Sequence, residues 1–257
     1  MTGNRDLDQG SGLRRAGFAP LPRLLAALLV STSCLAAEPR VLRLNETNAP
    51  PFSNPQRTGF YDVVVTEALR RAGLRLEIVT LPAERALLLS DSGASDGELN
   101  RNAAVEKAYR NLVRVPEKLG EMQFVAFSKD AATPASLDAF RGRTVGLVRG
   151  WKIYEQALAG RADVISAEDA GQLFSMLDLE RVDVALYERS MGRAELDLRA
   201  MDQVRTLEPP LFVREQFIYL HRSHAELVPP IAAALRAMKR DGTYQRAYRE
   251  KIEGIAR

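Results

Sequence analysis

VLRLNETNAPPFSNPQRTGFYDVVVTEALRRAGLRLEIVT, residues 41–80, is the stretch that decides the fold. It predicts a strand over 41–46, a turn rich in Pro and Gly over 49–59, a helix over 61–72 and a second strand over 76–80. Within the helix the apolar residues recur at positions 64, 65, 68, 69 and 72, a spacing typical of one buried stripe. The stretch therefore predicts the beginning of a lobe in which strands and helices alternate.

The same order of elements recurs in the second half of the chain. Residues 144–188 predict strands over 144–148 and 163–166, helices over 151–159 and 169–177, and a closing strand that ends at Glu188. In both halves a short strand that bears an aspartate closes the unit. Two successive units of this kind predict an α/β protein with two similar lobes. Two lobes that face each other form a cleft, and clefts are where small ligands bind.

Polar and turn-forming segments along the chain predict where the lobes begin and end. A strand over 124–128 leaves the first lobe, and the polar segment that follows it suits a boundary. A strand over 216–221 suits the return crossing, and two helices are expected after it. The expected division is a leader over 1–37, the first lobe over 38–129, an inserted second lobe over 130–215, and the remainder of the first lobe over 216–257.

The first 37 residues predict a secretory signal peptide. Three arginines between positions 14 and 23 precede a short apolar run over 24–30, and small residues follow it. This pattern is typical of such leaders, and the apolar core is too short to span a bilayer. Cleavage after Ala36 or Ala37 would release a mature chain into the periplasm. Processing as a lipoprotein at Cys34 is the alternative.

Composition excludes several classes of function. Residues 38–257 hold 32 basic and 31 acidic side chains and no basic tract with interleaved aromatics, so we expect no nucleic-acid partner. Cys34 lies in the leader, so the mature chain has no disulfide, thiol nucleophile or cysteine metal site. His221 and His224 have no acidic residue at ligand spacing, and we interpret them as solvated loop residues. We therefore expect no metal and no cofactor.

Several motifs, taken in order, resemble the extracellular solute-binding proteins of family 3. They are the Pro-Pro-Phe of residues 50–52, Gly59, and residues 92–97, 137–146, 181–188 and 238–244. The resemblance implies the type II periplasmic-binding-protein fold, in which two α/β lobes are joined by two crossing strands. It also implies that the lobes close around a ligand by a hinge motion.

The resemblance also implies a function and its partners. Proteins of this family capture an amino acid or a related small polar compound, and they deliver it to the membrane permease of an ABC importer. The contact with the permease is transient, and the receptor is expected to be a monomer. Two alternatives stay open on the same fold. One is a periplasmic enzyme similar to cyclohexadienyl dehydratase, with Glu188 as general acid, and the other is an orphan sensory module.

Four residues of the second lobe are candidate ligand contacts. Glu188 stands five positions after Asp183, where the resemblance implies an acidic residue that binds the ligand's ammonium group. The backbone N–H groups of Gly150, Trp151 and Lys152 are expected at a helix N-terminus, where unpaired donors and the helix dipole favour a carboxylate. Trp151 is also the sole tryptophan, and its ring is a candidate for packing on the ligand.

The first lobe offers a less complete set of contacts. Its relatives carry an Arg that forms a bidentate pair with the ligand carboxylate, but the corresponding position in this chain is Ala108. Arg101, just beyond the end of a predicted strand, is the substitute we favour over Lys107. Phe52, on the rigid turn after the first strand, is either a ligand contact or a core residue. Arg85, in the first turn of its helix, either reaches the cleft or is solvated.

Overall fold

The computed structural model describes residues 39–47, 49–161 and 163–256. The predicted signal peptide, its cleavage site and Cys34 lie outside the described residues. Within the described part the strands form one mixed sheet in the order β2-β1-β3-β9-β5-β8-β6-β7, and β4 pairs with β9. None of the helices there is long and apolar enough to cross a membrane.

The strands are bounded as follows: β1 Arg40–Glu46, β2 Leu74–Thr80, β3 Gly97–Arg101, β4 Leu112–Arg114, β5 Gly120–Ser128, β6 Val145–Val148, β7 Val164–Ala167, β8 Val184–Glu188 and β9 Arg205–His221. The α-helices are α1 Phe60–Arg71, α2 Ala83–Ser92, α3 Lys152–Ala157, α4 Ala170–Asp178, α5 Arg189–Arg199, α6 Val228–Arg240 and α7 Thr243–Lys251. Three short 3₁₀-helices complete the set: η1 Ala103–Lys107, η2 Arg222–Leu227 and η3 Glu253–Ala256.

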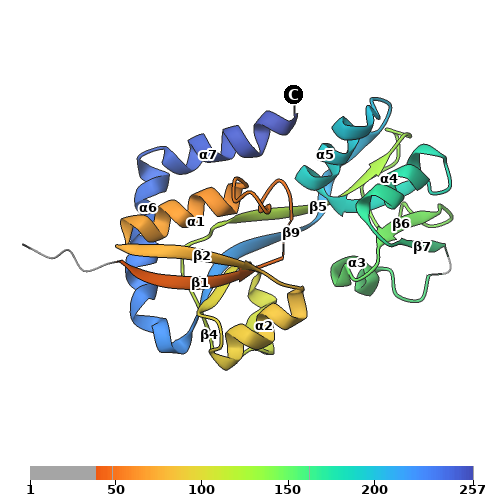
Figure 1. Ribbon diagram of the computed structural model, residues 1–257. Coiled ribbons are helices and arrows are strands. Elements are labelled where there is room, and N and C mark those ends of the chain that lie inside the picture. Colours follow the sequence, from red (N-terminus) through yellow and green to blue (C-terminus); the bar gives the residue numbers. More distant parts are fainter. Residues whose placement is uncertain (1–38, 48, 162, 257) are drawn as a thin grey trace, which may run out of the picture. The chain divides into compact units, whose positions relative to one another are not determined.

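Two groups of parallel strands flank a central antiparallel pair. β1 lies parallel to β2 and β3 on one side, and β6 lies parallel to β7 and β8 on the other. Between the groups, β5 and β9 pair antiparallel to each other, and each also pairs with one group. Figure 1 shows these two long strands running between the two sets of helices. The predicted α/β class, in which two groups of strands and helices are joined by two crossing strands, is confirmed.

The core follows the predicted apolar stripe of the first helix. Val64, Val65, Ala68 and Leu69 are fully buried on α1, and they share one cluster with residues of α6 such as Leu235. The helices after β9 therefore pack on the group of strands that begins the chain. The residues around β6 and β8 form separate clusters of their own. The residue boundaries of the two lobes stay a prediction.

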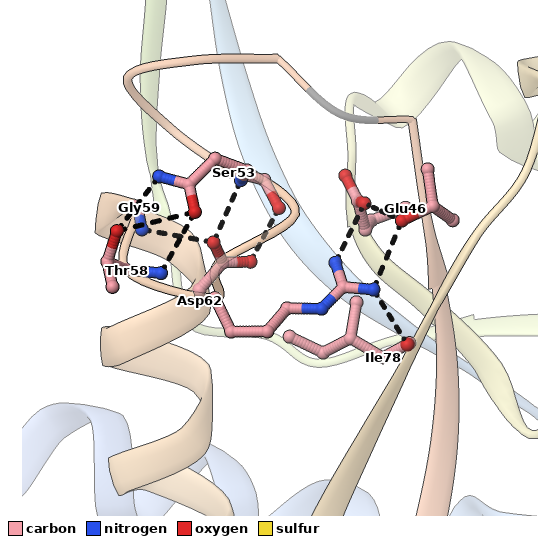
Figure 2. Close-up of polar contacts among 9 residues, drawn as sticks. Glu46, Ser53, Thr58, Gly59, Asp62 and Ile78 are labelled. Atoms are coloured by element: carbon pink, nitrogen blue, oxygen red, sulfur yellow. Dashed lines mark hydrogen bonds and ion pairs between the residues drawn. The ribbon is translucent and has the colours of Figure 1, made fainter.

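Asp62 stabilises the turn that links β1 to α1. Its buried carboxylate accepts hydrogen bonds from Ser53 Oγ at 2.5 Å and from the backbone N–H groups of Asn54 and Gly59 at 3.0 Å each (Figure 2). A carboxylate at the first turn of a helix is also stabilised by the helix dipole. The turn is thus held in one conformation at the carboxyl end of β1.

Two elements differ from the sequence prediction. The helix α5 was not predicted, because its side chains are mostly polar and only Gly192 is buried. β9 begins eleven residues before the expected return strand, and it passes through Pro209 and Pro210. The prolines are tolerated because the pairing with β5 shifts register there, from Phe124 opposite Phe212 to Ala126 opposite Leu207. Proline in a sheet is confined to such irregularities and to edges.

Candidate functional site

The larger candidate cavity has a volume of about 580 Å³ and is lined by residues at or beyond the ends of strands from both groups. Its volume lies within the range of small-molecule sites. Part of the lining follows the carboxyl end of β3 and part follows the carboxyl end of β6, which is where α/β sheets bind ligands. The lining residues are Arg101, Asn102, Ala104, Met122, Phe124, Gly150, Trp151, Lys152, Ile153, Gln156 and Arg214.

A second cavity, of about 280 Å³, has a different lining. It is bounded by α7, by the N-terminus of α5 and by the first residues of β5. Its lining residues are Phe52, Lys118, Gly120, Glu121, Gln123, Glu188, Arg189, Ser190, Tyr244 and Tyr248. We refer to the two as the larger and the smaller cavity.

Strand β5 contributes to both cavities. Met122 and Phe124 line the larger one, whereas Glu121 and Gln123 line the smaller one. Successive side chains of a strand point to opposite faces of the sheet. The side chains of Met122 and Phe124 therefore lie on one face of this strand and those of Glu121 and Gln123 on the other, and the candidate site residues predicted from the sequence are divided between the two cavities.

Arg101 lines the larger cavity and forms an ion pair with Glu98, which does not line it. The Nε–H of Arg101 donates to Glu98 Oε2 at 2.8 Å, and Nη2 lies 2.6 Å from the same oxygen. The other oxygen of Glu98 accepts from Ser90 Oγ at 2.6 Å, and Ser90 in turn accepts from Asn45 Nδ2 at 2.9 Å. Burial raises the pKa of Glu98, and the Arg101 guanidinium opposes that rise. One edge of the guanidinium is therefore fixed.

The three backbone donors expected after β6 already have acceptors in this structure. Gly150 N donates to Glu155 Oε1 at 2.7 Å, Trp151 N to Val148 O at 3.2 Å, and Lys152 N to Gly150 O at 2.9 Å. The Glu155 carboxylate also pairs with Lys152 Nζ at 2.7 Å, so both of its oxygens have partners within this turn. The side chains of Trp151 and Lys152, rather than the backbone N–H groups, are what this turn presents to the larger cavity.

The side chain of Trp151 is half-buried and rests on other aromatic rings. Its ring centroid lies 4.5 Å from that of Tyr187 and 5.9 Å from that of Phe124, which also lines the larger cavity. Aromatic contacts of this kind hold a ring in a defined orientation. The larger cavity therefore has a fixed aromatic wall.

Glu188 lines the smaller cavity and caps the helix that follows it. Its carboxylate accepts from the backbone N–H groups of Ser190 at 2.8 Å, Met191 at 2.9 Å and, across to β5, Gln123 at 3.3 Å. Only 1% of the residue is exposed. Burial raises the pKa of Glu188 to about 7, although the three backbone donors act in the opposite direction. The structure does not bring Glu188 and Arg101 into one cavity.

The remaining two candidate site residues, Phe52 and Arg85, differ in their burial. Phe52 is 3% exposed, stacks on Tyr61 with centroids 5.1 Å apart and belongs to the main core cluster, so its interpretation as a core residue fits better. It also forms part of the wall of the smaller cavity. Arg85 is exposed on α2 and lines neither of these cavities.

Sequence reasoning missed several residues that line the larger cavity. Met122 and Phe124 lie on β5, and Arg214 is an exposed residue of β9. The signal for Arg214 was obscured because β9 was expected to begin only at Gln216. Among the histidines, His224 is not a solvated loop residue, because its Nε2 lies 2.8 Å from Asp96 Oδ1. Within the described part of the chain no group of His, Cys, Asp and Glu could hold a metal ion.

No family model matches the chain. A protein of Shewanella oneidensis described as uncharacterized is 24% identical over 207 residues, which cover 72% of this chain and 73% of that protein. This level of identity leaves membership of family 3 a hypothesis.

Solved structures with the same fold are numerous. The ligand-binding core of GluR0 in complex with L-glutamate has a TM-score of 0.71 at 13% identity, covering 82% of this chain and 98% of that one. An ancestral arginine-binding protein bound to arginine has a TM-score of 0.67 at 19% identity, covering 83% and 99%. A histidine kinase sensor domain with similarity to periplasmic binding proteins has a TM-score of 0.67 at 17% identity, covering 83% and 96%. This chain therefore shares the mixed α/β fold of periplasmic-binding-protein-like structures.

Proposed function

We propose that this chain is a periplasmic solute receptor that captures a small polar ligand in the larger cavity and passes it to the permease of an ABC importer. The observation that carries the proposal is the position of this cavity. It lies at the carboxyl ends of strands from both groups, beside the two long strands β5 and β9. Two groups linked in this way can close on a ligand by a hinge motion.

The solved structures support a binding role rather than a particular ligand. One was solved with arginine and another with L-glutamate, and a third belongs to a sensor kinase. The same capture step serves transport and sensing, so the partner is tested separately from the ligand. Loss of solute uptake after deletion of the gene would support transport, whereas intact uptake with loss of a signalling response would support the sensory alternative.

The binding role is tested by a ligand screen on the purified mature protein. Amino acids, polyamines and small carboxylates are added one at a time, and thermal unfolding is followed. A ligand present at about 100 times its Kd should add roughly 2.7 kcal/mol to the free energy of unfolding. A screen in which no compound of any class raises the unfolding temperature would count against a solute receptor.

Arg101→Lys should weaken binding of a carboxylate-bearing ligand about tenfold. Lysine keeps the charge and can still pair with Glu98, but it lacks the planar fork that binds a carboxylate through two hydrogen bonds. Trp151 lines the same cavity and is the sole tryptophan, so its fluorescence can report the titration. The matched control is Arg110→Lys, the same chemical change at an exposed residue that does not line the cavity. Equal affinities in the two variants would exclude Arg101 from the ligand contacts.

An enzyme of the dehydratase type is the second candidate function, and one observation favours it. A carboxyl group with a pKa near 7, as Glu188 has, is suited to donate a proton at neutral pH. The same carboxylate accepts three backbone hydrogen bonds and lines the smaller cavity, which does not favour contact with a ligand bound beside Arg101. Incubation with a cyclohexadiene that carries a ring hydroxyl and a ring carboxylate distinguishes the two functions, because loss of water with CO2 would leave an aromatic ring whose absorption can be followed.

A further inference from the structure

We infer that the ligand of the larger cavity is an organic carboxylate that carries an apolar body and no ammonium group. The inference rests on the proposed function of that cavity and specifies the chemistry of its ligand. It departs from the amino acid that the resemblance implies. Three features carry it: the charge of the lining, the place of the acidic residues, and the apolar wall.

The charged side chains that line the larger cavity are all cationic. They are Arg101 after β3, Lys152 at the start of α3 and Arg214 on β9, and no Asp or Glu belongs to the lining among the described residues. The cations come from three separate elements. Such a site raises the local concentration of anions and repels cations.

Two of these cations are already paired with carboxylates that do not line the cavity. Glu98 pairs with Arg101 and is fully buried behind it. Glu155 pairs with Lys152 and accepts from Gly150 N. A ligand ammonium would have to displace one of these cations from its partner. Arg214 donates from Nη1 to the carbonyl of Val213, and no ion pair of Arg214 occurs in the described part of the chain, so its charge is left for the ligand.

Glu188, the residue to which the resemblance assigns the ligand's ammonium group, does not line the larger cavity. Glu188 lines the smaller cavity, and its oxygens accept three backbone hydrogen bonds. An ammonium group bound in the larger cavity would therefore be desolvated without a carboxylate partner. Burial of an unpaired charge is strongly unfavourable. The structure thus disfavours both zwitterionic and cationic ligands at this place.

The rest of the wall fits an apolar body. Met122 and Phe124 from β5 and Trp151 and Ile153 from the α3 region line the cavity together. The rings of Trp151 and Phe124 lie edge to face, with an angle of 76° between their planes. A ligand chain or ring against this wall would bury apolar surface, while its carboxylate reaches the cations. Both contacts are available to an aromatic or aliphatic acid.

The experiment compares three charge states on one apolar side chain, by calorimetry on the mature protein; the amine of each set is the amino acid without its carboxylate. The aromatic set is 3-phenylpropanoate, phenylalanine and 2-phenylethylamine, and the aliphatic set is hexanoate, 2-aminohexanoate and pentylamine. In at least one set we expect the carboxylate to bind roughly tenfold or more tightly than the zwitterion, and the amine to show no binding. Arg214→Gln should reduce the carboxylate affinity by about tenfold, whereas Arg222→Gln, the same change at an exposed residue outside the cavity, should not.

The outcomes separate this inference from the proposed function. Tighter binding of an amino acid or an amine than of its carboxylate analogue would overturn the inference and leave the solute receptor intact. The inference would also be overturned if neither 3-phenylpropanoate nor hexanoate bound while the broad screen had found another ligand. An Arg214→Gln variant that binds the carboxylate as the wild type does would also overturn it. Absence of any ligand in the broad screen would instead reject the proposed function itself.

Discussion

Gly97→Ala should lower the free energy of unfolding by about 3 kcal/mol or more, the upper range for overpacking. A Cβ at this position would lie 2.0 Å from the carbonyl oxygen of Tyr219 and 2.9 Å from Cα of Leu220. Both atoms belong to the backbone of β9, which pairs with β3 there, so no side-chain rotation relieves the clash. The two strands would have to separate, and the register that carries Arg101 to the cavity would be disturbed.

Urea unfolding of the two purified variants, Gly97→Ala and Gly73→Ala, measures this effect. Gly73 is the control because it has a φ of +75° and no atom within 4 Å of an added Cβ. Its replacement should cost only the backbone strain, about 1 kcal/mol. If both variants lost the same stability, the close approach of β3 and β9 would not be the reason for a glycine at position 97.

Between pH 5 and pH 8 the wild-type protein should lose roughly 2.5 kcal/mol of stability through Glu188 alone. The pKa of Glu188 is about 7 in the folded protein, against an ordinary value of 4.5. The folded state therefore binds more protons than the unfolded state between these values, and stability falls as the pH rises through the window. Each pKa unit corresponds to about 1.4 kcal/mol. The stabilisation that Glu188 contributes is fully present below the unfolded-state pKa and is lost as the pH rises above the folded-state pKa of about 7.

Glu188→Gln removes the titrating group and should flatten this part of the pH profile. The glutamine oxygen can still accept from the N–H groups of Ser190 and Met191, so the cap of α5 is retained in part. Urea unfolding at pH 5, 6, 7 and 8 gives the slope for each protein. The control is Glu215→Gln, at a side chain that is 55% exposed, which should keep the wild-type slope. A Glu188→Gln profile as steep as that of the wild type would mean that other groups control the dependence.

The elements with strong periodicity were predictable from the sequence. The unit from β1 to β2 was found because α1 has one apolar stripe and because prolines and glycines mark the turn before it. The helix α5 lacked such a signal, since it buries only Gly192, whose added Cβ would lie 2.3 Å from the ring of Phe127. A helix that packs through a glycine leaves no hydrophobic pattern in the sequence.

The candidate site residues predicted from the sequence stay a prediction, and the structure divides them between the two cavities. Arg101 and Trp151 were both expected in the cleft because each lies at the carboxyl end of a strand, and the two residues line the larger cavity together. The engagement of Gly150 N by Glu155 depends on a side chain that folds back over its own turn. Likewise, the direction of Glu188 depends on whether a helix begins directly after it, and α5 was not predicted. Both outcomes are set by local hydrogen bonds that spacing alone does not reveal.

The alternation of β5 between two cavities limits how this strand can change in evolution. Loss or gain of one residue in the strand would turn Glu121 and Gln123 toward the cations and Met122 and Phe124 toward the smaller cavity, since the side-chain period of a strand is two. A carboxylate would then enter the larger cavity while its apolar wall left it. Substitutions in β5 can adjust one cavity at a time, but insertions and deletions exchange the two linings together. Differences in length among relatives should therefore fall in the loops on either side of β5 and spare the strand itself.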